Sequence, residues 1–469
     1  MSQPVVAAII LAAGGSSRFG EPKPLLRWED RPLIARAVDT AWTAGLAPVI
    51  AVVGAEAERV APELAGRPAQ VLRNYRWAEG MSASLAVGLA ALPASVDAAI
   101  FLPVDQPLIT PALLRGLVAR WQATAASIVV PEDAAGRRGT PALFARDFFP
   151  ELAALSGDVG GRALFARYPD RLTTYRVADP AALIDVDTPE AFARLQARAR
   201  DSAPQSPLSR ARAVLCDMDG VLWRGSQPLP GLHAFFAHLE AEALPYVLVT
   251  NNSSRTPAQY LAKLASLGVT CEARHVLNAS LAAAEYLANA LEPGASVYPI
   301  GGDGVYWALE ARGFRIASGE TPVDAVVVGW DRGLTWEKLA TATLCIRGGA
   351  RFVATNPDRT FPSERGLVPG NGSQIAALEA ATGVEAVTVG KPEALLYRQA
   401  LARMQAAPEH TLVIGDRLDT DILGGLRLGM PTALLLSGVT RREELPQSPI
   451  RPDVVFEDLA ALVAAWRHT

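Results

Sequence analysis

The chain has 469 residues, half of them hydrophobic and a fifth charged, which is too long for one hydrophobic core and predicts at least two domains. Its net charge of -4 gives no electrostatic sign of nucleic-acid or anionic-membrane binding. Three separated cysteines, with no CxxC pair, argue against a disulfide framework or a zinc site. We therefore expect a soluble cytoplasmic protein with small-molecule partners, no nucleic acid and no membrane, and leave a homodimer open.

Short apolar runs alternate with helical patterns through the first 200 residues. The run VVAAIILAA near the N-terminus is too short to span a bilayer and lacks the basic flank of a secretory signal, so it predicts a buried strand. The repeated alternation predicts a parallel α/β sheet covered by helices on both faces. The Pro/Ser-rich segment 201–209 then interrupts the pattern, and the strand pattern restarts at about residue 210. We expect two doubly wound, Rossmann-like α/β domains, at residues 1–200 and 210–469.

A glycine-rich loop follows the first predicted strand and ends in Lys23. Its glycines let the backbone approach a ligand, consecutive amides can form an anion-binding nest, and Arg18 and Lys23 add positive charge for a polyphosphate. The loop lacks the Gly-Lys-Ser/Thr of a Walker motif, and no GxGxxG fingerprint is present, which disfavours an ATPase or a dehydrogenase. Another stretch, residues 80–85, opens a helix whose amides and hydroxyls are predicted to hold a phosphate or a base.

Two carboxylates lie where the ends of strands are expected in this first half. Asp105 follows the apolar strand 98–104, and Asp187 belongs to an acidic pair before a helix. Carboxylates from separate strand ends can hold Mg2+, which orients a triphosphate and offsets charge as pyrophosphate leaves. For Asp187 an alternative is that the side chain only caps the helix that begins at Thr-Pro-Glu.

The motifs LAAGGSSRFGEPKPLL, EGMSASL, LPVDQP and DVDTPE, in this order, resemble nucleotidyltransferases of the molybdenum-cofactor type, in the molybdopterin cytidylyltransferase-like branch. The resemblance implies attack by an acceptor phosphate on the α-phosphorus of a nucleoside triphosphate, with pyrophosphate departing. Gly139-Thr140-Pro141 stands where that branch has Gly-His-Pro, so other phosphorylated acceptors stay open. The implied residues are Lys23 and Arg18 for catalysis, Asp105 and Asp187 for Mg2+, and Ala13, Gly14, Gly15, Ser16, Ser82 and Ser84 for the nucleotide.

In the second half, the apolar strand 213–216 ends in Asp217 and Asp219. The first carboxylate can attack phosphorus, and the second can protonate the leaving alkoxide and later activate water. Three later strand ends supply what phosphoryl transfer to a carboxylate needs in addition. These are the donors Thr250, Asn251 and Asn252, the cation Lys391, and the acidic cluster of Asp416 and Asp421, which with Asp217 could complete a magnesium site.

These motifs, DMDGVLWRG, VTNNSS, VGKPE and GDRLDTDILGG, resemble the NagD-like (type IIA) branch of the haloacid dehalogenase superfamily. The resemblance implies a phosphomonoesterase with Asp217 as nucleophile, Asp219 as acid/base and a backbone ligand of Mg2+, Asp416 as metal ligand and Asp421 in support. The long interval between VTNNSS and VGKPE must fold, and the resemblance implies an α/β cap at roughly 285–386. Residues 354–374, rich in turn formers, are the candidate cap residues facing the substrate.

We therefore expect a bifunctional enzyme, with Mg2+-dependent nucleotidyl transfer in the first domain and phosphomonoester hydrolysis in the second. The alternative is a phosphatase whose first domain only binds a nucleotide as a regulatory module. A non-catalytic scaffold is disfavoured, because a scaffold does not need Asp217, Asp219, Lys391 and Asp416 together. The nucleotide base, the acceptor, the phosphatase substrate, the order of the two reactions and the oligomeric state stay open.

Overall fold

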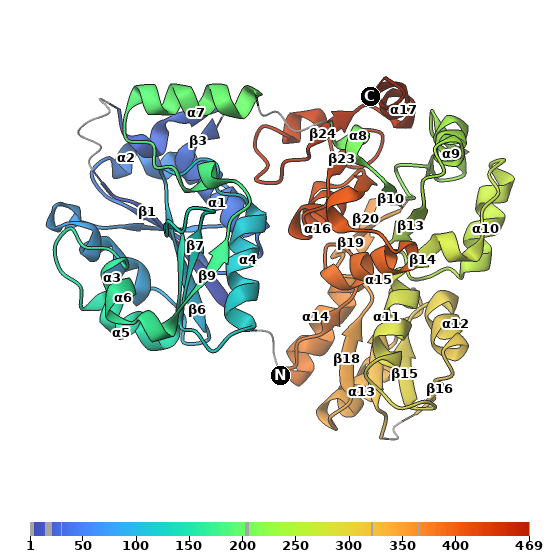
Figure 1. The fold of residues 1–469 in the computed structure, drawn as a ribbon. Helices are drawn as coiled ribbons and strands as arrows, with labels where there is room; N and C mark the ends of the chain where they lie inside the picture. The colour runs from blue at the N-terminus through green and yellow to red at the C-terminus, as the bar shows by residue number, and fades with distance from the viewer. Residues whose placement is uncertain are drawn as a thin grey trace. The chain divides into compact units, whose positions relative to one another are not determined.

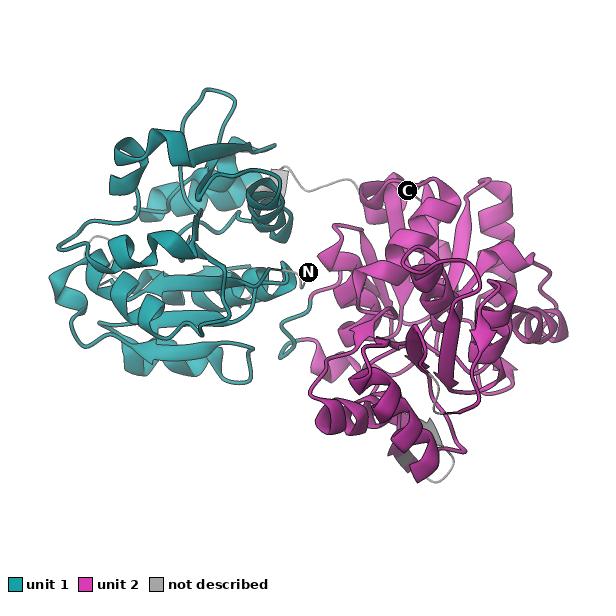
Figure 2. Cartoon of the chain, turned by 90° about the horizontal axis from the view of Figure 1, so that it is seen from below, with its two compact units in different colours: residues 1–204, 446–450 teal, residues 205–445, 451–469 magenta. Residues whose placement is uncertain are grey.

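The computed structural model describes residues 4–14, 21–29, 31–201, 206–319, 322–363 and 366–468. The chain divides into two compact units, residues 1–204 with 446–450 (unit 1) and residues 205–445 with 451–469 (unit 2), as Figure 2 shows. The division lies within the Pro/Ser-rich segment 201–209. In the described ranges no helix has both the length and the apolar surface that crossing a bilayer demands.

Unit 1 is built on a seven-stranded sheet with the order β5-β4-β1-β6-β8-β7-β9. Figure 1 labels β1, β6, β7 and β9 of this sheet. β1 is parallel to β4 and β6, but β8 is antiparallel to both β6 and β7, so the sheet predicted as parallel is mixed. Only residues 133–141 join β7 to β8, too few for the crossover that parallel neighbours require. The strands are β1 (Val6–Ala12), β4 (Val49–Val53), β5 (Gln70–Arg73), β6 (Ala98–Pro103), β7 (Ile128–Glu132), β8 (Ala142–Ala145) and β9 (Leu172–Arg176).

Helices cover both faces of this sheet, because β4 is buried at every position and needs apolar cover on each side. One core packs the sheet against α1, α4 and α7, and the other packs it against α3, α5 and α6. The helices are α1 (Leu33–Thr43), α2 (Ala57–Val60), α3 (Met81–Ala90), α4 (Pro111–Gln122), α5 (Phe149–Ala153), α6 (Ala163–Arg167) and α7 (Pro189–Asp201), and a small hairpin joins β2 (Arg27–Trp28) to β3 (Arg31–Pro32).

The central sheet of unit 2 has six parallel strands in the order β14-β13-β10-β22-β23-β24. β10 lies between β13 and β22, so the carboxyl ends of these three strands meet at one edge. The strands are β10 (Ala213–Asp217), β13 (Tyr246–Thr250), β14 (Val276–Asn278), β22 (Thr411–Gly415), β23 (Thr432–Leu435) and β24 (Val454–Phe456). The covering helices are α8 (Pro207–Arg210), α9 (Leu232–Ala241), α10 (Pro257–Ser266) and α17 (Leu459–Trp466), which contribute to one core, and α11 (Ala279–Ala288), α15 (Ala394–Met404) and α16 (Leu423–Arg427).

Unit 2 also holds a second sheet, inserted between β14 and β22 in the sequence. It has five parallel strands in the order β16-β15-β17-β18-β21, which lie between residues 296 and 388, whereas the cap was predicted at roughly 285–386. Its elements are β15 (Ser296–Ile300), α12 (Asp303–Ala311), β16 (Arg315–Ile316), β17 (Ala325–Val328), α13 (Trp336–Arg347), β18 (Arg351–Ala354), the hairpin β19 (Thr360–Ser363) and β20 (Gly366–Pro369), α14 (Asn371–Thr382) and β21 (Val387–Thr388). The α/β fold class with two sheet-based units is thus confirmed.

Candidate active sites

Asp217 is the last residue of β10, a strand buried at every position. Its neighbours β13 and β22 run parallel to it, which places Thr250 and Asp416 at the same edge of the sheet. The Asp217 side chain is 9% exposed. A carboxylate at this position is fixed by the sheet and faces the crevice where ligands of such sheets bind.

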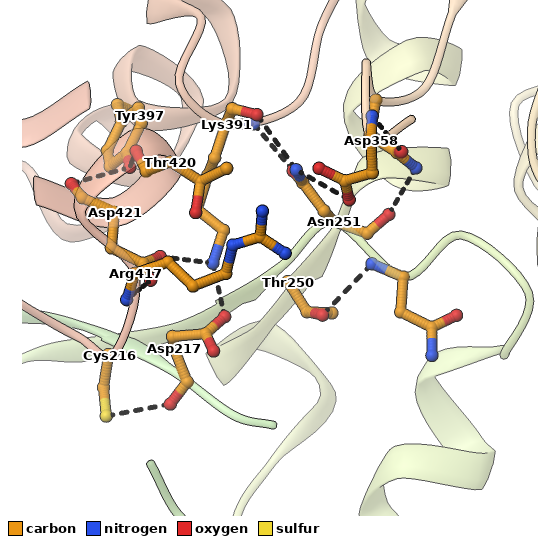
Figure 3. A network of polar contacts seen from close by, with 12 residues as sticks. Cys216, Asp217, Thr250, Asn251, Asp358, Lys391, Tyr397, Arg417, Thr420 and Asp421 are labelled. Carbon is orange, nitrogen blue, oxygen red and sulfur yellow. Dashed lines mark hydrogen bonds and ion pairs between the residues drawn. The ribbon is translucent and has the colours of Figure 1, made fainter. Parts of the chain in front are cut away.

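Lys391 connects two of the carboxylates gathered at this edge (Figure 3). Its Nζ contacts Asp217 Oδ1 and lies 2.6 Å from Asp421 Oδ1, and its side chain is only 4% exposed. Asp217, Asp416 and Asp421 each place a carboxylate oxygen within 4.8 Å of the others. Three buried carboxylates therefore face a single buried ammonium.

The donor set at this edge fits a divalent cation. Asp416 Oδ2 accepts a hydrogen bond of 2.7 Å from the backbone N–H of Val439, but its Oδ1 is buried and has no hydrogen-bond partner among the described residues. Burial, together with the charge of Asp421, raises the pKa of Asp416 to about 7. Burial also raises the pKa of Asp217, against the opposing charge of Lys391. A hard cation with oxygen ligands would satisfy the orphaned oxygen and the unbalanced charge.

Glycines let the backbone close around Asp416. Gly220 has φ +91°, in the left-handed region that favours glycine, and a Cβ atom there would overlap the Asp416 carboxylate. A Cβ atom on Gly438 would overlap the same carboxylate from another loop. Glycine at these two positions leaves the space that the Asp416 carboxylate occupies.

The three donors predicted after β13 are engaged in different ways. Asn251 donates from Nδ2 to the Lys391 carbonyl at 2.9 Å, and its Oδ1 accepts from the Lys391 N–H at 2.7 Å. Thr250 Oγ1 accepts from the Asn252 N–H at 3.1 Å, and Asn252 Oδ1 accepts from the hydroxyl of Ser254 at 2.7 Å. The Asn251 side chain therefore fixes the backbone of Lys391, and the phosphate contacts expected of Thr250, Asn251 and Asn252 stay predictions.

Asp219 lies near the cluster but outside it. Its Oδ1 accepts a hydrogen bond of 2.7 Å from Trp223 Nε1, and its side chain is 53% exposed. It does not belong to the group of carboxylates that could hold a metal ion among the described residues. The Asp219 side chain is thus not among the candidate metal ligands, and the role of its backbone oxygen as a ligand stays a prediction.

Two residues at this site were not singled out from the sequence. Asp358, within the predicted segment 354–374, accepts a hydrogen bond of 3.4 Å from Asn251 Nδ2, and burial raises its pKa. Arg417 pairs with Asp419 at 3.0 Å; burial lowers the Arg417 pKa, but this pairing outweighs it and the net shift is upward. More than a hundred residues separate Asp358 from Asn251, so no local pattern predicts that they lie together. The turn-rich composition of 354–374 indicated only the segment to which Asp358 belongs.

Unit 1 has a cavity of about 1180 Å³ at the carboxyl ends of β1 and β6. Lys23, Asp105 and Asp187, which were predicted to act together, all line it, as do Ala13 and Gly14. Lys23 Nζ lies 2.9 Å from Asp105 Oδ2 and 2.8 Å from Asp187 Oδ1. Gly15, Ser16 and Arg18 lie outside the described residues.

The helix-capping alternative for Asp187 is decided by its neighbour. Thr188 Oγ1 accepts the hydrogen bond from the N–H of Ala191 in the first turn of α7, whereas the Asp187 carboxylate contacts Lys23. Burial lowers the pKa of Lys23, but the hydrogen bonds with Asp187 and Asp105 outweigh it and the net shift is upward. Burial and the charge of Asp105 raise the pKa of Asp185. Asp187 is therefore part of the charged end of the cavity.

Ser82 and Ser84, predicted to bind a phosphate or a base, are both buried and bonded within the protein. The Ser82 hydroxyl donates to the carbonyl of Gly157 at 2.7 Å, and Ser84 Oγ accepts from Asn74 Nδ2 at 3.0 Å. These bonds tie α3 to the loop at residue 157 and to the end of β5. Ser84 also lines the cavity of unit 1, and the nucleotide contact expected of both serines stays a prediction.

Family comparisons agree with this geometry. Residues 8–172 match the model described as a MobA-like NTP transferase domain, residues 214–315 match a haloacid dehalogenase-like hydrolase, and residues 388–462 match a HAD-hydrolase-like model. An acid sugar phosphatase of Staphylococcus saprophyticus is 38% identical over 252 residues, which are 54% of this chain and 96% of that protein.

Solved structures give the same picture. The p-nitrophenyl phosphatase of Archaeoglobus fulgidus is 34% identical, with a TM-score of 0.52, and the match covers 54% of this chain and 99% of that one. The glycerol phosphate phosphatase of Mycobacterium tuberculosis, solved in complex with magnesium, is 38% identical, with a TM-score of 0.51, over 55% of this chain and 78% of that one.

The fold and the aspartate cluster thus define unit 2 as a phosphatase of the haloacid dehalogenase class. The similar glycerol phosphate phosphatase of Mycobacterium tuberculosis has been solved with magnesium and with calcium. More narrowly, the chain belongs to the NagD-like haloacid dehalogenase hydrolases and carries, in front of that domain, a MobA-like NTP transferase domain. Both resemblances drawn from the sequence motifs are confirmed.

Proposed function

We propose that the chain is a bifunctional enzyme, in which unit 2 hydrolyses phosphomonoesters through an aspartyl-phosphate and unit 1 transfers a nucleotidyl group to a phosphorylated acceptor. The observation that carries the first activity is the contact between Lys391 and Asp217 beside the orphaned oxygen of Asp416. A nucleophilic carboxylate, a fixed cation and a vacant oxygen ligand are the parts that this chemistry needs.

In the first half-reaction, an Asp217 oxygen attacks phosphorus and the bond between phosphorus and the alcohol oxygen breaks. Asp219 gives its proton to the departing oxygen, and Lys391 offsets charge on the nucleophile and the phosphoryl group. Water then attacks the aspartyl-phosphate, Asp219 takes the proton, and Asp217 leaves as a free carboxylate with inorganic phosphate as the product. Asp217, Asp416 and the backbone oxygen of Asp219, with Asp421 in support, would hold Mg2+, which would neutralise negative charge on the phosphoryl oxygens.

The substrates that we propose for unit 2 are small phosphorylated metabolites. The similar proteins from Staphylococcus saprophyticus and Mycobacterium tuberculosis are an acid sugar phosphatase and a glycerol phosphate phosphatase, respectively. Phosphate release from a panel of sugar phosphates, polyol phosphates and an aryl phosphate tests this proposal. A protein that releases phosphate from none of them would contradict it.

Mg2+ should raise the melting temperature of the protein more at pH 8 than at pH 6. The folded state, without cation, holds a proton on Asp416 up to a pKa of about 7, against 3.8 for the ordinary carboxyl, so its stability falls as the pH rises through 7. Cation binding must displace that proton and therefore stabilises most above pH 7. Asp416→Asn should remove most of the Mg2+-dependent shift at both pH values. An equal shift at pH 6 and pH 8 in the wild type would contradict this assignment.

For unit 1, we infer that an acceptor phosphate attacks the α-phosphorus of a nucleoside triphosphate and pyrophosphate leaves. The pairing of Lys23 with Asp105 and Asp187 inside one large cavity supports this reaction. A lysine and two carboxylates can bind a triphosphate and the Mg2+ that accompanies it. The test is a matrix of four nucleoside triphosphates against phosphorylated metabolites, followed by pyrophosphate release.

Lys23→Ala should reduce pyrophosphate release by about 100-fold or more, because it removes the ammonium that reaches the phosphates. Phosphate release by unit 2 should stay within about twofold of wild type, because the two activities use different residues. Lys338→Ala, on α13 between β17 and β18 of unit 2, is the matched lysine control for transfer. Nucleotide binding without pyrophosphate release from any acceptor would instead favour a regulatory nucleotide-binding module.

A further inference from the structure

Two side chains hold the carboxylate of Asp219, and neither takes part in the mechanism above. Trp223 Nε1 donates to Asp219 Oδ1 at 2.7 Å, and Lys263 Nζ lies 3.9 Å from the same oxygen. The Lys263 ammonium also lies 4.0 Å from the centroid of the Trp223 ring. An indole donor and a cation stacked on its ring therefore converge on one carboxylate oxygen.

Trp223 and Lys263 are much less exposed than Asp219, the residue that they contact. Trp223 is fully buried, the Lys263 side chain is 17% exposed, and the Asp219 side chain is 53% exposed. Burial lowers the pKa of Lys263, against the charge of Asp219. A mostly buried lysine loses hydration of its ammonium and needs a partner of opposite charge. Lys263 is also one of only four lysines in a chain rich in arginine. One oxygen of the acid is thus held on the buried side, and the carboxylate remains open to solvent.

The backbone brings both holders to this place. The N–H of Gly220 donates to the carbonyl of Trp223 at 2.8 Å, so the chain turns back and presents the indole to Asp219. Lys263 lies in the last turn of α10, which begins after the donor loop that follows β13. Tyr260, also on α10, donates from its hydroxyl to the carbonyl of Asn252 in that loop at 3.1 Å. The helix therefore links the donor loop to Asp219 through rigid contacts.

We propose that Trp223 and Lys263 are positioning residues, which hold the Asp219 carboxyl in the orientation from which it transfers its proton to the leaving oxygen. This inference rests on the proposed phosphatase activity. The step that they serve is the first half-reaction: the phosphorus bond to Asp217 forms, the bond to the alcohol oxygen breaks, and the proton of Asp219 ends on that oxygen. Lys263 and Trp223 act through Asp219 and transfer no proton themselves.

Substrates with different leaving groups can distinguish this positioning role from a purely structural one. An alkoxide is strongly basic and needs a proton as it departs, whereas 4-nitrophenolate is stable as an anion and departs without one. The ratio kcat/KM includes only the steps up to enzyme phosphorylation, so it isolates this half-reaction. A loss of orientation should therefore affect an alkyl phosphate and spare the nitrophenyl ester.

The experiment compares glycerol 1-phosphate with 4-nitrophenyl phosphate in wild type, Trp223→Phe and Lys263→Met. We expect kcat/KM to fall by about 10- to 100-fold for the alkyl ester and by less than about 3-fold for the aryl ester. Lys263→Arg, which keeps a cation able to stack on the indole, should recover part of the alkyl activity. Lys263→Met added to Asp219→Asn should cause no further loss of kcat/KM, because both changes remove the same interaction.

Equal losses on both esters, or a Lys263→Met effect that adds fully to Asp219→Asn, would overturn the positioning role while leaving the phosphatase intact. A wild-type protein that hydrolyses neither ester would overturn the proposed phosphatase activity and this inference with it. Trp223 is fully buried, so its variant is checked by melting temperature, and the partly exposed Lys263 carries the test if Trp223→Phe does not fold.

Discussion

Asp217→Asn should reduce phosphate release from an aryl phosphate by about 10⁴-fold or more. The amide is nearly isosteric with the carboxylate but cannot attack phosphorus, and it removes the charge that Lys391 contacts and that a cation would need. The substitution also removes one of three crowded buried carboxylates, so we expect folding to survive. The measurement is kcat with 4-nitrophenyl phosphate at saturating Mg2+, next to the melting temperature.

Asp303→Asn is the matched control, since this exposed aspartate lies on α12, the helix that follows β15 of the inserted sheet, and the substitution is chemically the same. It should leave hydrolysis within about twofold of wild type. Pyrophosphate release by unit 1 should survive Asp217→Asn unchanged. Hydrolysis by Asp217→Asn at more than a hundredth of the wild-type rate would show that another group is the nucleophile.

Lys391→Met is expected to impair both activity and stability. The side chain is 4% exposed and contacts Asp217 and Asp421, so its loss leaves buried carboxylates without their cation. Removal of one partner from a buried ion pair typically costs about 3–5 kcal/mol, and we expect kcat to fall by about 10³-fold. Thermal unfolding and steady-state hydrolysis measure the two effects.

The pH dependence of the Lys391→Met variant separates lost charge from lost packing. Burial raises the Asp217 pKa already in the presence of Lys391, and without the lysine it should rise further. A raised pKa means stability that is present at low pH and lost as the pH rises through that value, so the variant should recover stability relative to wild type between pH 8 and pH 6. Lys338→Met, which loses an ion pair of 2.6 Å with Asp331 at a more exposed position, should show no such recovery. A pH-independent difference between Lys391→Met and wild type would contradict the electrostatic account.

The residues at the strand ends were the part of the site that could be predicted from the sequence. Polar residues that directly follow buried parallel strands must meet at one edge of a sheet, and Asp217, Thr250 and Asp416 follow β10, β13 and β22 in that manner. Lys23, Asp105 and Asp187 come together in unit 1 by the same rule. Their proximity is a consequence of topology, whereas their chemical roles stay predictions until the variants are measured.

Other features depend on partners that a linear pattern does not reveal. The serines of α3 and the amide of Asn251 carry donors suited to a phosphate. Only the structure shows that Ser82 bonds to Gly157 and that Asn251 bonds to the backbone of Lys391, 140 positions away. The reversal of β8 follows from a connection too short for a crossover, which the strand pattern alone did not expose. Trp223 was not singled out from the sequence, because only the fold turns its N–H toward Asp219.

The central claim is that phosphorus passes through Asp217, and the most direct measurement is mass spectrometry of the protein after acid quenching during turnover of a phosphomonoester. We predict a phosphoryl group on the peptide that contains Asp217, and no phosphorylated peptide in Asp217→Asn. Treatment with borohydride should reduce the phosphorylated Asp217 to homoserine. A phosphoryl group on another residue, or turnover with no phosphorylated peptide in either protein, would contradict the account.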